Sequence, residues 1–210
     1  MRSSYEYMTY PQVVQDFVRT LSVNAAFCFN PLAHHAFAAE ISNPELKNMQ
    51  SPNIKIGKMP TYHAETLSER KVTLPLDFPG NRTLLLVTFA QAQQKNMDTW
   101  VVGLGLLKSP MAWAVLPVID KQNAFVQAII NSGMRMGTQD AAERDRTIPL
   151  FTSQEDFIAA MQIKSGLKIN YAQVVDRLGT VWAIVAGDYS AEKAAPLLAA
   201  LAATAESEGK

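Results

Sequence analysis

The stretch Thr83-Leu84-Leu85-Leu86-Val87-Thr88-Phe89 is an apolar run that follows a turn at residues 77–81. Such a run, without alternating polar positions, is typical of a strand covered on both faces, as in a parallel sheet. The segment 90–100 follows at once and is rich in helix formers such as Ala, Gln, Lys and Met. The sequence therefore predicts an α/β fold around a central buried strand.

Other segments with strand or helix patterns lie on both sides of this unit. We predict a short hairpin from residues 61–67 and 71–74, strands at 112–119 and 147–152, helices at 123–134 and 154–162, a hairpin over 170–185 and a closing helix at 191–205. The segment 137–146 is charged and poorly periodic, so we expect it to be an irregular surface stretch. This order predicts a mixed sheet flanked by helices.

The chain is expected to divide near residue 54, because turn-forming residues are dense over 41–60. We predict an N-terminal extension over 1–53 and a folded domain over 54–210. Within the extension, residues 25–40 resemble the apolar region and small-x-small cleavage site of a signal peptide, with cleavage after Ala38. This predicts export, for example to the periplasm. The alternative is a retained amphipathic N-terminal helix and a cytoplasmic protein.

Composition excludes several classes of partner. The chain has 210 residues, of which 48% are hydrophobic, and its 19 basic residues balance 19 acidic ones. Without a basic run there is no stripe to neutralise phosphates, so we expect no nucleic acid partner. The longest apolar stretches are much shorter than the roughly 20 residues that cross a bilayer. We therefore expect no transmembrane helix.

The order of the predicted elements resembles the thioredoxin-like fold over about residues 54–204. Met59-Pro60-Thr61-Tyr62 resembles the entry segment of thiol-disulfide interchange proteins and peroxiredoxins, and the segment 175–181 (VDRLGTV) resembles their penultimate hairpin. That hairpin, together with 187–192 (GDYSAE), is also similar to the C-terminal part of the thioredoxin-like assembly-factor family of mitochondrial ATP synthase. Phe89, with Gln94 and Trp100 on the following helix, shares this similarity.

The departures from the redox members concern the chemistry. In those members a cysteine pair lies between the first buried strand and its helix, where the helix N-terminus lowers the thiol pKa. Here that segment is 90–95 (AQAQQK), and the only cysteine of the chain is Cys28, in the extension. The redox members also carry a cis-proline before the penultimate strand, where this chain has Lys168-Ile169-Asn170. We therefore expect no catalytic residue in the domain and a non-redox protein that acts by binding a protein partner.

The resemblance also locates a candidate partner-binding face, because redox relatives meet their partners at the start of this helix. Neutral amides there are suited to binding extended peptide backbone. The predicted face comprises Gln91, Gln93, Gln94, Asp98, Ile169 and Asn170. The alternatives are a plain solvated first turn, a thiol-independent enzyme with polar groups Gln91, Gln94 and Asp98, and a thiol protein that uses Cys28.

Cofactors and metals are not expected. His34, His35 and His63 are the only histidines, and with a single cysteine they form no zinc-ligand spacing. The sequence does not indicate the oligomeric state. The role that it favours is that of an assembly or accessory factor of an envelope or membrane complex.

Overall fold

The computed structural model describes residues 55–203. The predicted extension, with Cys28 and the signal-peptide-like segment 25–40, lies outside the described residues. Within residues 55–203, no helix is long and apolar enough to span a membrane.

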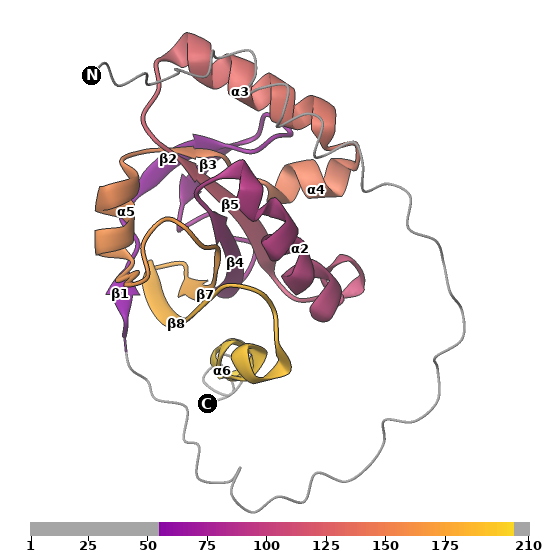
Figure 1. The fold of residues 1–210 in the computed structure, drawn as a ribbon, viewed down its shortest axis with the longest axis vertical. Coiled ribbons are helices and arrows are strands. Elements are labelled where there is room, and N and C mark those ends of the chain that lie inside the picture. Colours follow the sequence, from indigo (N-terminus) through magenta and orange to yellow (C-terminus); the bar gives the residue numbers. More distant parts are fainter. Residues whose placement is uncertain (1–54, 204–210) are drawn as a thin grey trace, which may run out of the picture.

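A six-stranded mixed sheet forms the centre of the fold, in the order β1-β8-β7-β4-β5-β6 (Figure 1). β4 is parallel to β5 and β5 to β6, whereas the remaining neighbours are antiparallel. A separate antiparallel pair, β2 and β3, forms the predicted upstream hairpin. The strands are β1 Gly57–Lys58, β2 Tyr62–Glu65, β3 Lys71–Leu74, β4 Arg82–Thr88, β5 Trp113–Ile119, β6 Leu150–Phe151, β7 Tyr171–Asp176 and β8 Thr180–Ala186. The predicted mixed sheet is confirmed.

Helices connect these strands and cover the sheet. They are the 3₁₀ turns η2 Gln91–Gln93 and η3 Leu106–Lys108, and the α-helices α2 Gln94–Gly103, α3 Ala124–Gly137, α4 Ala141–Arg146, α5 Gln154–Ala160 and α6 Ala191–Ala202. Asn123, Ser153 and Ser190 cap α3, α5 and α6 by accepting a hydrogen bond from a backbone N–H of the first turn.

Two predictions about helices are wrong. The helix after β4 does not begin at Ala90, because the chain first makes the 3₁₀ turn η2 and α2 starts only at Gln94. The segment expected to be irregular contains α4. There Asp140 caps the helix by accepting from the backbone N–H of Glu143, and the Arg144 side chain donates to the carbonyl oxygens of Thr138 and Gln139. Capping and side-chain anchoring fix this short helix, although its apolar periodicity is poor.

β4 is buried on both faces, as its sequence predicts. Leu84 and Leu86 pack in one cluster with residues of α2 and α6, and Leu85 and Val87 pack in another with residues of the β2–β3 hairpin and α5. None of the four is more than 1% exposed. Successive strand residues thus supply two separate cores, which places helices on one face of the sheet and the hairpin with α5 on the other.

The β7–β8 hairpin is held by one carboxylate. Asp176 accepts hydrogen bonds from the backbone N–H groups of Leu178 (2.9 Å) and Thr180 (2.8 Å) and from the indole of Trp182 (2.8 Å). Gly179 has φ +86°, and a Cβ at that position would lie 2.5 Å from the carbonyl oxygen of Met59. These contacts explain why Asp and Gly occupy the turn of the hairpin that the sequence predicts.

Gln173 on β7 is a polar residue inside the core. Its side chain is fully buried, and neither polar atom of its amide has a hydrogen-bond partner among residues 55–203. A buried amide without partners destabilises the folded state, because it loses its hydrogen bonds to water.

We predict that Gln173→Met stabilises the protein. The substitution removes the unpaired amide and keeps a side chain of similar length, so the free energy of unfolding should rise by about 1–3 kcal/mol. Urea denaturation followed by circular dichroism measures this change. Val174→Ala, at the adjacent buried position, should destabilise the protein and serves as the control. A loss of stability in Gln173→Met would show that the amide is satisfied in solution.

Candidate binding site

A cavity of about 230 Å³ opens at the carboxyl ends of β4 and β5. Its walls come from the chain that leaves β4 (Thr88 to Gln91, with Gln94), from the end of β5 (Pro117 to Ile119) and from α3 (Ile130, Gly133, Met134). Most of these groups are apolar, and Gln91 and Gln94 add amides at one side. Ligands of open α/β sheets bind at this end of the strands, which makes the cavity a candidate binding site.

The three predicted glutamines have different roles. Gln91 and Gln94 both line the cavity. Gln93 does not: it is 6% exposed, its Oε1 accepts from the Phe89 N–H at 2.7 Å, and its Nε2 donates to the Leu167 carbonyl at 2.6 Å. The expectation that all three amides are exposed is therefore wrong for Gln93, because turn η2 directs this side chain inward. Gln93 fixes the loop before α2 and ties it to the segment before β7.

Asp98 lies one turn beyond Gln94 and is half-buried. It accepts a hydrogen bond from the Gln94 amide at 3.3 Å, which orients that amide at the cavity. Burial raises the pKa of the Asp98 carboxyl, and the hydrogen bond from Gln94 partly opposes this. Glu143 of α4 is also half-buried, and its pKa is raised by burial and by repulsion from Asp140 and Asp98, although Arg146 lowers it. α2 and α4 thus bring carboxylates near each other.

Ile169 and Asn170 do not line the cavity. Asn170 is 2% exposed, and its side-chain amide donates to the Gly187 carbonyl at 3.2 Å. Ile169 is half-buried and packs against the core cluster that contains Leu85 and Val87. The expectation that these two residues form part of an exposed face is wrong for Asn170, whose amide instead secures the loop after β8.

Two contributions to the site were not predicted. Gln154, the first residue of α5, donates from its Nε2 to the carbonyl oxygens of Phe89 (3.0 Å) and Val118 (2.7 Å), and so joins the ends of β4 and β5. The apolar wall from α3 was missed as well. The sequence signal for α3 was its apolar periodicity, which indicates a buried stripe but not the cavity beside it.

Among residues 55–203, no group of three or more His, Cys, Asp or Glu side chains is placed so that it could hold a metal ion. The loop 89–94 holds amides where the resemblance to redox proteins would place thiols. Amide groups do not attack disulfides, and the side chains of this loop offer apolar contact and hydrogen bonds.

No protein-family model matches the sequence, and no curated protein matches it. Solved structures do. A proposed electron transfer protein from Aquifex aeolicus VF5 is 12% identical with a TM-score of 0.50, covering 70% of this chain and 96% of its own. The Sco-family protein BsSco, from a family of cytochrome c oxidase assembly proteins, is 11% identical with a TM-score of 0.49, covering 71% and 94%. A proposed thiol:disulfide interchange protein DsbE from Chlorobium tepidum is 20% identical with a TM-score of 0.43, covering 70% of this chain and 98% of its own.

At these identities the likeness bears on the fold alone. The strand order, the crossover from β4 through α2 to β5 and the C-terminal hairpin with its helix confirm the predicted thioredoxin-like α/β fold. The resemblance to the ATP synthase assembly-factor family remains a prediction.

We predict that Asp98→Asn stabilises the protein at neutral pH. Because burial raises the folded-state pKa, the folded protein binds this proton more tightly than the unfolded chain, and stability falls as the pH rises from the unfolded to the folded pKa. Asparagine removes this loss. The gain at pH 7 should stay below about 1 kcal/mol for a half-exposed group. The gain should vanish below about pH 4, because the Asp98 carboxyl is then protonated in both the folded and the unfolded protein.

Urea denaturation of parent and variant between pH 3 and pH 8 measures this difference. A variant less stable than the parent at pH 7 would contradict the assignment of Asp98 as a carboxylate that burial disfavours.

Proposed function

We propose that the chain is a non-redox thioredoxin-like protein that acts by binding another protein, as an assembly or accessory factor of an envelope or membrane complex. The observation that carries this proposal is the apolar cavity at the start of α2, flanked by Gln91 and Gln94 at the place where redox relatives hold their thiols. A surface that keeps the location of the partner site but lacks the nucleophile is suited to recognition without reaction.

The size and surroundings of the cavity favour a protein partner. At about 230 Å³ it is smaller than the roughly 300–1,000 Å³ of drug-sized ligand sites, so it suits one or two apolar side chains of a partner. α3 also carries the exposed apolar residues Phe125 (75% exposed) and Met136 (68%), although neither of them lines the cavity.

Two parts of the proposal, the role in assembly and the export of the chain, are supported by the sequence. The segments 175–181 and 187–192 resemble the mitochondrial ATP synthase assembly-factor family, which favours a role in assembly. The signal-peptide-like segment 25–40 favours export, in which case a chain cleaved after Ala38 has no cysteine. Within the proposal, residues 1–53 are an extension and residues 54–210 the partner-binding domain.

Substitution of Ile130 by Arg tests the site. A partner recovered with the tagged wild-type protein from its native source is identified, and its affinity for each purified variant is then measured. Ile130→Arg places a charge at the apolar wall, so it should weaken binding roughly tenfold or more, a loss of at least about 1.4 kcal/mol. The matched control is Leu178→Arg, at a 78% exposed apolar residue in the β7–β8 turn, which should bind as the wild type does.

Equal affinity of Ile130→Arg and wild type, with both folded by circular dichroism, would contradict the proposed site. The Cys28→Ser variant distinguishes the proposal from a thiol protein that uses Cys28, because the proposal expects unchanged binding in this variant. Disulfide reductase or peroxidase activity that disappears in Cys28→Ser would contradict a non-redox role.

A further inference from the structure

The apolar face of α3 is only partly covered by the rest of the domain. Apolar residues recur along this helix at Val126, Ile129 and Ile130, yet the residues of the helix that are buried are Gly133 and Met134. An amphipathic helix of a folded domain normally buries its apolar stripe against a neighbour. The candidate binding site opens beside this face, because Ile130, Gly133 and Met134 form one wall of its cavity. An apolar segment seated in the cavity would extend the burial of this face.

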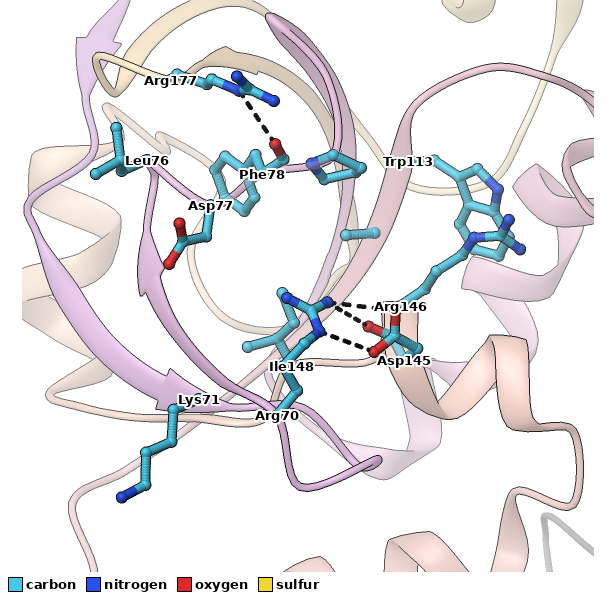
Figure 2. Close-up of a pocket in the computed structure, with 12 residues that line it drawn as sticks. Arg70, Lys71, Leu76, Asp77, Phe78, Trp113, Asp145, Arg146, Ile148 and Arg177 are labelled. Carbon is cyan, nitrogen blue, oxygen red and sulfur yellow. Dashed lines mark hydrogen bonds and ion pairs between the residues drawn. The ribbon is translucent and has the colours of Figure 1, made fainter.

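The cavity of the candidate binding site is uncharged, whereas a second cavity is not. None of the residues that line the first is Asp, Glu, Lys, Arg or His. The second cavity, of about 650 Å³, lies where β5 begins, and its lining includes the Arg70–Asp145 ion pair, Asp77 and Arg177 (Figure 2). An apolar segment seated there would remove these charges from water, which is costly. An apolar occupant is therefore expected at the candidate binding site and not at the second cavity.

The chain carries an apolar segment of its own outside the described residues. Residues 25–29 (AAFCF) contain two aromatic side chains and no charged one. They begin the signal-peptide-like stretch 25–40, which the proposed export would remove by cleavage after Ala38. Contact of apolar side chains with water is unfavourable, so as long as this segment is part of the chain its burial against an apolar surface is favoured.

The covalent connection brings residues 25–29 within reach of the cavity. β1 runs antiparallel to β4 through the order β1-β8-β7-β4, so the chain that precedes β1 comes from the side of the sheet on which β4 ends. β1 and β5 are four strand spacings apart, which is roughly 20 Å. Residues 30–54 can span up to about 80 Å when fully extended. Such a tether gives the segment an effective concentration on the order of millimolar at the cavity.

We infer that, in the uncleaved chain, residues 25–29 dock intramolecularly in the candidate binding site, with a phenylalanine side chain of this segment in the cavity. Segment and cavity match in chemistry, since both are apolar and uncharged, and in size, since about 230 Å³ suits one or two apolar side chains. The docked segment occupies the place of the partner. This consequence rests on the proposed function: cleavage after Ala38 removes the segment and opens the site.

The full chain tests the docking through its single thiol. Cys28 is the only cysteine, so a nitroxide spin label attached to it reports on its surroundings without any substitution. In the NMR spectrum, docking should broaden the backbone amide signals of 89–94 and 130–134 several-fold more than those of 177–179, in the β7–β8 turn. The variant Cys28→Ser/Asn24→Cys, labelled just outside the segment, should give the same pattern and covers the case of a label that blocks docking.

Two variants of the labelled full chain should lose this pattern. Phe27→Asp/Phe29→Asp places charges in the docked segment, and Ile130→Arg places one at the cavity wall. Burial of either charge is costly, so the broadening at 89–94 should fall to the level at 177–179. Phe17→Asp/Leu21→Asp, an equal charge change at apolar residues of the extension outside 25–29, is the matched control and should keep the broadening.

Partner affinity gives a readout that damage to the fold cannot mimic. Because residues 25–29 compete for the cavity, only the undocked fraction of the full chain is free to bind the partner. Full-length Phe27→Asp/Phe29→Asp should therefore bind the partner identified for the proposed function roughly tenfold more tightly than the full-length wild type. Phe17→Asp/Leu21→Asp should bind it as the wild type does.

Equal broadening at 89–94 and 177–179 in the wild type, or broadening at 89–94 that survives Ile130→Arg, would overturn the docking. Broadening that disappears on dilution would overturn it as well, because the occupant would then be a second copy of the chain. Unchanged or weaker partner affinity of Phe27→Asp/Phe29→Asp would contradict the competition. The proposed function fails separately, since it falls when Ile130→Arg leaves partner binding unchanged, whatever the spin label shows.

Discussion

The burial of β4 on both faces is the constraint on which the rest of the structure depends. A strand with no exposed face needs a neighbour on each edge and a layer on each side, and β4 has β5 and β7 as neighbours, the α2 and α6 layer on one face and the β2–β3 hairpin with α5 on the other. Every such layer removes apolar side chains from water, the main stabilising contribution in a domain of this size. The carboxyl end of β4 is therefore a fixed point from which the loop before α2 departs.

The candidate binding site follows from how that loop is fixed. Gln93 binds the loop through the backbone N–H of Phe89 and the carbonyl of Leu167. Gln154 joins the loop to β5 through the carbonyl oxygens of Phe89 and Val118. Both are neutral amides, which satisfy donors and acceptors without a charge that burial would penalise. The result is a preformed apolar cavity with Gln91 and Gln94 among the residues that line it, and the proposed function assigns it to partner recognition.

The sequence predicts a part of the fold correctly where the residue types that favour a local structure are also the types that its tertiary contacts require. The apolar run of β4 and the Asp176–Gly179 turn are such cases, because burial and turn geometry each restrict the residue types allowed. The role of Gln93 is not predictable this way: a glutamine in the first turn of a helix is usually solvated, and only the distant Leu167 carbonyl makes its burial favourable. α4 was missed because its capping and side-chain anchors, not periodicity, fix it.

Hydrogen exchange tests the central claim most directly, that this domain binds its partner at the carboxyl ends of β4 and β5. The amides of the protein isolated with its partner are compared with those of the protein alone. The account predicts that protection increases in 89–94 and in 130–134 of α3, and is unchanged in the β7–β8 turn at 177–179. Protection confined to that turn, or found elsewhere and not at 89–94, would contradict it.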